Sequence, residues 1–320
     1  MSFDTEYHFP LYVYHISNYK KYMATDYSVN NYGDGQPWLP VRPKVLLVSG
    51  VHGSEKGTPN FLHDFIASMR RDADSAELLT KYDWTIVPLA SPWGYSHSFV
   101  SNGGAVYYGQ AWRPSSYPNL VENTEENGYN SGSRYVSNNW DSYTRSVDPN
   151  RDFDDVAGFE AEETQFIRDN VLTQETFDVV IDMHQRAEDA GKQYSFVCFK
   201  GAGLTDAQMQ PLYQTVVEAG AATDVAMATK YGLDAGVQYS YPSAYGTLLS
   251  FSNYAAGKSK NGHGFIDELF TPARYAMTIE TSPVCADYSG SSAWHNPIAN
   301  EYGNTFVHNF LTKFLGKLEL

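Results

Sequence analysis

The sequence predicts an α/β fold with a mixed, mostly parallel central sheet and helices on both faces. Short, nearly continuous apolar runs alternate with longer amphipathic segments, which is typical of this class. The runs lack a polar–apolar alternation, so we expect the strands to be buried on both faces. The predicted strands are Lys44–Ser49, Trp84–Leu89, Phe177–Asp182, Tyr194–Phe199, the less clear Tyr239–Tyr245 region and Tyr275–Glu280.

Four helices are predicted from apolar periodicity in the segments between and after these strands. Asn60–Arg70 places its apolar residues on one face, and Glu160–Leu172 opens with acidic residues, which suit a helix N-terminus. The other two cover 205–230 and 300–318. Residues 96–147 break the rhythm, because they are rich in Ser, Asn, Tyr and Gly, and they are predicted to form a long functional or disordered loop.

The chain is predicted to be one domain over residues 1–320, with 1–42 as an N-terminal extension, edge elements such as a strand pair, or an oligomer contact. Its 320 residues are 42% hydrophobic, enough for a sizeable core. No internal repeat or Pro/Gly-rich linker divides the sequence. The oligomeric state is left open by the sequence.

Charge and hydropathy exclude several classes of partner. The net charge of −15 argues against nucleic acid, since phosphate binding needs concentrated Lys and Arg. No apolar run approaches the roughly 18 residues of a membrane span. No secretory signal is visible, which favours a cytoplasmic or phage-associated protein. Cys198 and Cys285 are then expected to be reduced thiols, although a distant pair could form a disulfide.

The first candidate site residues are His52 and Glu55, which follow the predicted strand at Lys44–Ser49. With 9 histidines and 37 acidic residues in 320 positions, chance alone gives about one His-x-x-Glu match. A polar turn is therefore the simplest interpretation of the motif alone. Its place, after a buried strand and before a helix, is nevertheless where open α/β sheets form their ligand crevices.

A third candidate ligand, His184, also ends an apolar strand, where a histidine at the edge of the core with satisfied hydrogen bonds is the simpler alternative. Two histidines and a carboxylate at strand ends suit zinc with one position open for water. Glu280 ends another strand, where it could serve as the general base beside a zinc-bound water or form a structural salt bridge.

Arginines near the same elements could grip a substrate carboxylate. Asn150 and Arg151 stand together in a turn before a helix, and Arg113 lies in the long loop. The planar guanidinium binds carboxylates in bidentate fashion. Each of these arginines, taken alone, could also be an ordinary surface residue.

Together these residues resemble, in order and rough spacing, the zinc carboxypeptidases related to carboxypeptidase A, over about 43–316. The resemblance implies one zinc ion per chain, held by His52, Glu55 and His184. It implies Glu280 as general base and Arg113 as the residue that stabilises the oxyanion. Asn150 and Arg151 match the pair that holds the terminal carboxylate of the substrate.

Residues around the side-chain pocket match less closely. Tyr241 corresponds to the family's mobile tyrosine, with Tyr239 and Tyr245 as competitors, and Leu248 falls at the pocket floor, which implies an apolar terminal residue. Arg145 is a rival to Arg113. Asp152 replaces the asparagine that usually follows the Asn-Arg pair, so an extra acid near the carboxylate site could alter substrate preference.

The resemblance implies a zinc-dependent metallocarboxypeptidase that acts on peptides with a free C-terminal carboxylate. One alternative keeps the zinc and changes the substrate, as in amidohydrolases of the desuccinylase/acylase type or peptidases of peptidoglycan stem peptides. An alternative of another class is a non-catalytic binding or virion protein on the same fold. Against it, every core catalytic position is filled.

Overall fold

A computed structural model describes the central sheet and its helices. The described backbone covers residues 2–4, 10–16, 42–53, 55, 57–92, 95, 101–102, 105–106, 121–122, 135–137, 144–147, 149–151, 153, 162–185, 196–201, 206–231, 273–281 and 297–318. Side chains are described at a subset of these positions.

The central sheet has six strands in the order β12-β13-β11-β4-β5-β3. Its four inner strands run parallel to one another: β4 (Lys44–Ser49), β5 (Asp83–Val87), β11 (Val179–Gln185) and β13 (Tyr275–Thr281). The outer strands β12 (Phe196–Gly201) and β3 (Tyr14–Ile16) pair antiparallel with β13 and β5. The predicted mixed, mostly parallel sheet is confirmed.

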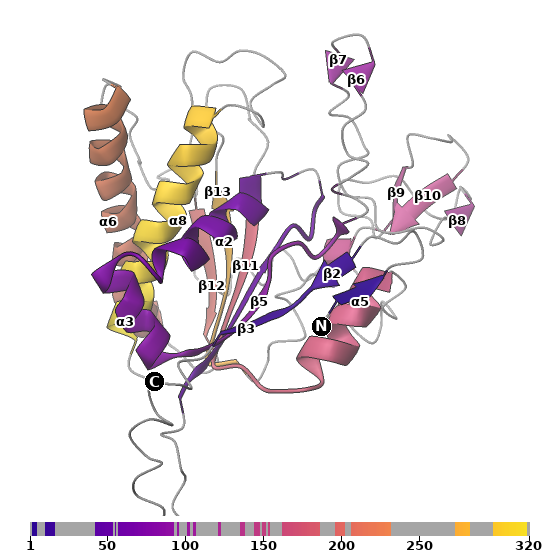
Figure 1. The fold of residues 1–320 in the computed structure, drawn as a ribbon, viewed down its shortest axis with the longest axis horizontal. Coiled ribbons are helices and arrows are strands. Elements are labelled where there is room, and N and C mark those ends of the chain that lie inside the picture. Colours follow the sequence, from indigo (N-terminus) through magenta and orange to yellow (C-terminus); the bar gives the residue numbers. More distant parts are fainter. Residues whose placement is uncertain are drawn as a thin grey trace, which may run out of the picture.

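Helices cover both faces of this sheet (Figure 1). One side carries α2 (Gly57–Ser68), α3 (Ala73–Lys81), α6 (Asp206–Tyr231) and α8 (Pro297–Lys317). The other side carries α5 (Glu162–Ile167), which continues as the π-helical turn η2 (Arg168–Leu172). Alternate strand residues feed two separate cores: Leu47 and Ile181 pack with α2, α6 and α8, whereas Leu46 and Val180 pack on the α5 side.

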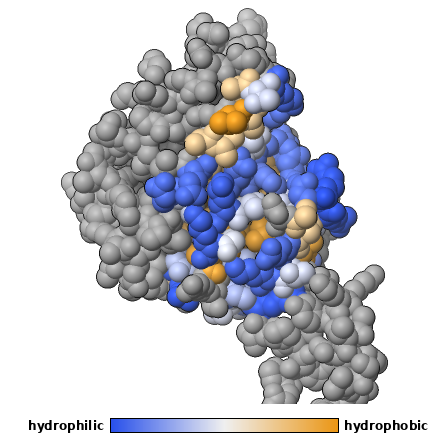
Figure 2. All heavy atoms as spheres, turned by 90° about the vertical axis from the view of Figure 1, so that its left-hand side faces the viewer, coloured by the Kyte–Doolittle hydropathy of each residue, from blue (hydrophilic) through white to orange (hydrophobic). Residues whose placement is uncertain are grey.

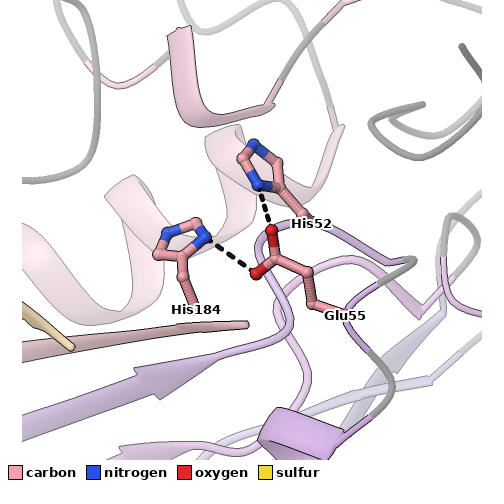
Figure 3. A group of neighbouring side chains, drawn as sticks. All are labelled: His52, Glu55 and His184. Carbon is pink, nitrogen blue, oxygen red and sulfur yellow. Dashed lines mark hydrogen bonds and ion pairs between the residues drawn. The ribbon is translucent and has the colours of Figure 1, made fainter. Parts of the chain in front are cut away.

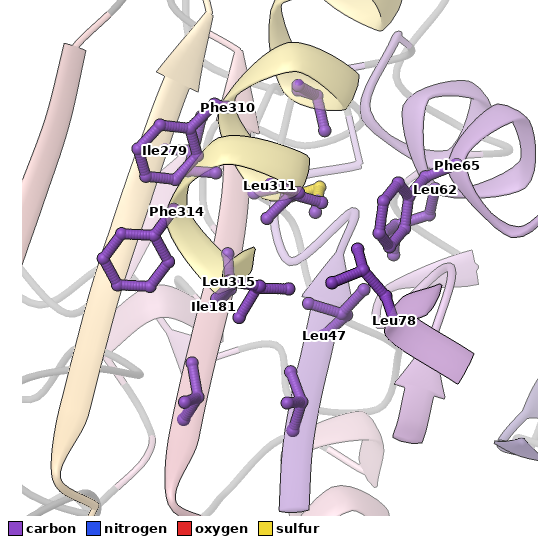
Figure 4. Packing of buried hydrophobic residues seen from close by; sticks show 14 of the residues in the cluster. Leu47, Leu62, Phe65, Leu78, Ile181, Ile279, Phe310, Leu311, Phe314 and Leu315 are labelled. Atoms are coloured by element: carbon purple, nitrogen blue, oxygen red, sulfur yellow. The ribbon is translucent and has the colours of Figure 1, made fainter. Parts of the chain in front are cut away.

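The larger core is organised by an aromatic stripe on α8 (Figure 4). Phe306, Phe310 and Phe314 recur every four residues, so they lie on one helix face, and all three are fully buried. Their rings stack with centroids 6.3 Å and 5.3 Å apart. Burial of each ring contributes roughly 1.5–3 kcal/mol. This packing holds α8 against the inner strands.

The outer side of the helices α2, α3, α6 and α8, away from the sheet, is mainly hydrophilic. Figure 2 views this side of the molecule, where the described surface is mostly polar with small hydrophobic areas. Ion pairs Lys230–Glu301 and Lys317–Glu218 join α6 to α8 across that surface. The same two helices thus contribute apolar residues to the larger core and charged pairs to the outer surface.

Short strands occupy the N-terminal segment and the segment predicted as a long loop. β1 (Ser2–Asp4) and β2 (Pro10–Tyr12) form an antiparallel pair, one of the possibilities expected for residues 1–42. Within 96–147 the structure has β6 (Ser101–Asn102), β7 (Ala105–Val106), β8 (Val121–Glu122), β9 (Tyr135–Ser137) and β10 (Thr144–Val147). These form a β6–β7 pair and a three-stranded sheet in the order β8-β10-β9.

Element boundaries differ from the predicted ones by a few residues. The first helix begins at Gly57, not Asn60, and Thr58 in its first turn donates to the Glu55 carbonyl. The strand predicted over Tyr194–Phe199 begins at Phe196. The predicted Tyr239–Tyr245 strand lies outside the described residues. None of the described helices is long and apolar enough to cross a membrane.

Candidate metal centre

The turn after β4 positions His52 and Glu55. Gly50 has φ 66°, in the left-handed region that glycine adopts without strain, and a Cβ there would lie 2.7 Å from Leu89 Cδ1. The Glu55 amide then donates to the His52 carbonyl at 3.1 Å, which closes a tight turn. Thr58 fixes the turn to α2, because its hydroxyl donates to the Glu55 carbonyl at 2.9 Å and accepts from the Gly50 amide at 3.2 Å.

The third residue comes from the neighbouring strand. β11 pairs directly with β4, so His184, near the carboxyl end of β11, lies beside the turn that carries Glu55. His52 Nδ1 is 2.8 Å from Glu55 Oε1, and His184 Nδ1 is 2.9 Å from Glu55 Oε2 (Figure 3). One candidate ligand atom from each side chain lies within 4.8 Å of the others. The Glu55–His184 contact thus joins residues 129 positions apart in the sequence, and the two histidines share one carboxylate.

These three side chains are buried, and their charges are strongly coupled. The exposed fractions are 4% for His52, 4% for Glu55 and 1% for His184. Burial alone would raise the pKa of Glu55, but attraction to His184 and His52 and their hydrogen bonds lower that pKa to about 2. Burial likewise opposes protonation of His184, but the carboxylates of Asp182 and Glu55 raise its pKa well above 6.5.

The other ring nitrogen of His184 contacts a residue that the sequence analysis missed. Nε2 lies 2.7 Å from Oδ2 of Asp182, which is 1% exposed. The available signal was the Asp-x-His spacing, because residues two apart in a strand lie on the same face. An acid beside a predicted metal-binding histidine could therefore have been recognised as its neighbour.

The chemistry of the three donors fits zinc. Two imidazole nitrogens and one carboxylate oxygen form the ligand set of catalytic zinc sites, which leave a fourth position open. All three groups are buried and oriented toward one another, so little rearrangement of the side chains is needed for an ion to replace the protons between them. His52, Glu55 and His184 are the residues that would hold it.

Other predicted site residues are placed only by their backbone or lie outside the described residues. Glu280, near the end of β13, is in parallel register with His184. Asn150 and Arg151 belong to the short 3-10 helix η1 (Pro149–Arg151), and Asn150 is partly buried. Arg145 lies in β10, where it pairs with Val121 and Ser137. The predicted residues outside the described part of the chain are Arg113, Asp152, Tyr239, Tyr241, Tyr245, Leu248 and Cys285.

Comparison with known proteins identifies the family. The family model described as zinc carboxypeptidase matches residues 9–286. Carboxypeptidase B of Helicoverpa zea is 25% identical over 129 residues, a stretch that covers 40% of this chain and 28% of that protein. The chain therefore matches well under a third of that relative's length.

Two solved structures share the fold. A metallo-carboxypeptidase from Pseudomonas aeruginosa superposes with a TM-score of 0.50 at 14% identity, covering 100% of this chain and 64% of that one. Thrombin activatable fibrinolysis inhibitor gives a TM-score of 0.53 at 14% identity, covering 99% of this chain and 70% of that one. At such identities the likeness concerns the fold alone.

Proposed function

Because the chain belongs to the zinc carboxypeptidase family, we propose that it is a zinc-dependent metallocarboxypeptidase that hydrolyses the C-terminal peptide bond of peptides. The observation that carries this proposal is the convergence of His52, Glu55 and His184 at the carboxyl end of the sheet. We propose one zinc ion per chain at this centre and a single catalytic domain over the whole chain.

When bound, zinc at such a site polarises a carbonyl and lowers the pKa of its water toward about 7. The protein's own contribution begins with the fixed direction of its ligands. The carboxylate of Glu55 lies between the two imidazoles. The turn at Gly50 and the hydroxyl of Thr58 hold the backbone of Glu55 in place. Ligands held in this way need little reorganisation during the reaction.

Glu280 is the proposed general base. Its backbone is in register with His184 on the adjacent parallel strand, and residues in register face the same side of a sheet. We therefore assign the proton transfer to Glu280, which takes the proton from the attacking water and passes it to the departing amine.

The protein is proposed to recognise its substrate by the free C-terminal carboxylate. Asn150 and Arg151 bind it, and their position in η1 just before the buried Phe153 ties this turn to the smaller core. Arg113 stabilises the developing oxyanion, Tyr241 closes over the bound residue, and Leu248 at the pocket floor favours an apolar terminal side chain. The proposed substrate is thus a peptide with an unblocked, apolar C-terminal residue.

Metal analysis coupled to a peptidase assay tests this function. Purified protein should contain one zinc per chain and release the terminal residue of a blocked dipeptide ending in Phe or Leu. A chelator should abolish this release, and added zinc should restore it. Zinc without release would contradict the peptide substrate, and parallel assays on acyl amino acids and muropeptides then identify which amide is cleaved. A chain with neither zinc nor release would contradict the proposed function and favour the alternative of a non-catalytic binding protein.

The variant Glu280→Gln tests the general base. It should keep zinc bound and lose activity by at least about 100-fold, because general base catalysis contributes roughly 100- to 10,000-fold. Glu218→Gln, at the outer face of α6 where Glu218 pairs with Lys317, is the matched control and should retain full activity. Full activity in Glu280→Gln would disprove the assignment.

A further inference from the structure

One sheet face of β11 carries a buried acid next to the metal centre. This face carries every second residue of the strand: Val180, Asp182 and His184. Val180 belongs to the smaller apolar core. Asp182 is 1% exposed. A carboxylate at such a position costs several kcal/mol unless it is paired and hydrogen-bonded, so its partner indicates why it is there.

The partner of Asp182 is the imidazole of His184. Asp182 Oδ2 lies 2.7 Å from Nε2, and within the described residues its Oδ1 is buried with no hydrogen-bond partner. The carboxylate is therefore directed at this one ring. On the other side of the ring, Nδ1 lies 2.9 Å from Glu55 Oε2. The two nitrogens of His184 thus face two different carboxylates.

We propose that Asp182 is a positioning residue, which accepts the Nε2–H of His184 and so presents Nδ1 to the ion. The proposal rests on the proposed function, because it assigns Asp182 a role toward the zinc that His52, Glu55 and His184 would hold. A carboxylate behind a metal-binding histidine fixes the tautomer and ring orientation and makes the ligand more basic.

The geometry distinguishes this role from two simpler ones. Asp182 is not a fourth ligand, because the three ligand atoms within 4.8 Å of one another come from His52, Glu55 and His184. It is also more than a structural ion pair. An ion pair could be satisfied by either ring nitrogen, whereas here rotation of the ring would break the contacts to both carboxylates.

Zinc affinity of two Asp182 variants tests the proposal. Asp182→Asn keeps the volume and a neutral acceptor, and it should weaken zinc binding about tenfold. Asp182→Ala removes the acceptor, and the loss should reach about 100-fold. Asp178→Asn is the matched control, because Asp178 precedes the other end of β11 and accepts the Lys44 amide at 2.8 Å. It should change affinity less than about twofold. Affinities are measured by competition with a chromophoric chelator.

A second measurement uses the metal-free chain, so it is independent of catalysis. Nitrogen-15 NMR of the histidine rings should show a slowly exchanging His184 Nε2–H in the wild type and in Asp178→Asn. The resonance should shift in Asp182→Asn and disappear in Asp182→Ala. A merely structural role for Asp182 would lower stability without this pattern.

The outcomes separate this proposal from the proposed function. Equal zinc affinity in wild type and Asp182→Asn, or an unchanged ring N–H in Asp182→Ala, overturns the positioning role. A wild type that binds zinc tightly but cleaves no peptide overturns the carboxypeptidase function, while the affinity series still decides the role of Asp182. A wild type that binds no zinc overturns both.

Discussion

Charged side chains gather at both ends of the inner strands, but the two groups are built differently. At the amino end, Lys44 Nζ lies 2.6 Å from Glu175, which also accepts from Thr85 at 2.9 Å. His15, on the edge strand β3, lies 3.1 Å from the Thr85 hydroxyl. The exposed fractions of Lys44 and Glu175 are 42% and 22%. This amino-end cluster links neighbouring strands, and water reaches part of it.

At the carboxyl end, two carboxylates and two imidazoles share a site where no side chain is more than 5% exposed. Here the acid–base pairs converge, because Glu55 and His184 each take part in two of the three pairs. Protons hold the group together in the metal-free protein, and a cation can replace them. Charged residues at a strand end are therefore insufficient evidence of a functional site. Several buried side chains that can ligate a metal and lie close together are stronger evidence.

The largest expected effect comes from making the same change in both clusters. Glu55→Gln should lower zinc affinity by more than about 100-fold, the upper range for residues that only support a ligand. Glu175→Gln should leave zinc affinity within about twofold, because Glu175 lies at the opposite end of the strands. Both are measured by chelator competition. Similar losses in the two variants would contradict the contrast between the ends of the sheet.

The pH dependence of stability should also distinguish the clusters. The pKa of Glu55 is lowered to about 2 from 4.5, so in the metal-free protein its stabilisation is present above pH 4.5 and is lost as pH falls toward 2. The pKa of His184 is raised above 6.5, so its stabilisation is present below pH 6.5 and is lost as pH rises through the raised value. The metal-free protein should thus be most stable between about pH 4.5 and 6.5.

With zinc bound, the loss of stability at high pH should be reversed, because the ion replaces ligand protons more easily as pH rises. Urea unfolding at a series of pH values, with and without zinc, measures both effects. The Glu175→Gln variant should still lose stability at high pH without zinc, and zinc should still reverse that loss. Metal-free stability that rises steadily above pH 7 would contradict the protonated His184 inferred from its two carboxylate neighbours.

A smaller effect is expected from Gly50→Ala at the turn that carries the metal centre. Its φ of 66° and the short approach to Leu89 Cδ1 should cost about 1–2 kcal/mol of unfolding free energy. Zinc affinity should also fall, since His52 and Glu55 follow this turn. Gly316→Ala, where a Cβ meets nothing within 4 Å, is the control and should be neutral or slightly stabilising. Chemical denaturation measures the unfolding free energy of each variant, and equal m-values in the variants and the wild type make these free energies comparable.

The smallest expected effect is the stability cost of Glu175→Gln itself. The pKa of Glu175 is lowered: burial alone would raise it, but hydrogen bonds from Lys44 and Thr85 and the nearby charges outweigh burial. Because Lys44 is substantially exposed, the ion pair should contribute about 1 kcal/mol or less and weaken with added salt. A salt-independent loss of several kcal/mol would show that the amino-end cluster is a buried network after all.

Local patterns were sufficient for much of the fold. The run at Lys44–Ser49 is a buried strand with the predicted bounds, since β-branched and aliphatic residues without polar alternation suit a strand covered on both faces. The helix predicted to Leu172 ends there, although its last turn is π-helical, a detail that no periodicity argument distinguishes. Edge elements were expected within residues 1–42, but the position of β3 was not predicted, because a three-residue strand that includes the exposed Tyr14 carries almost no hydrophobic pattern.

The residue types at the ends of predicted strands were enough to identify the candidates His52, Glu55, His184 and Glu280. The strand order could not be read from these local patterns: β11 lies between β4 and β13, which places His184 beside Glu55 and in register with Glu280. The tertiary structure also revealed Asp182 behind the His184 ring. The physical reason is that side-chain chemistry and periodicity are local, whereas strand order and register depend on how the whole chain packs its core.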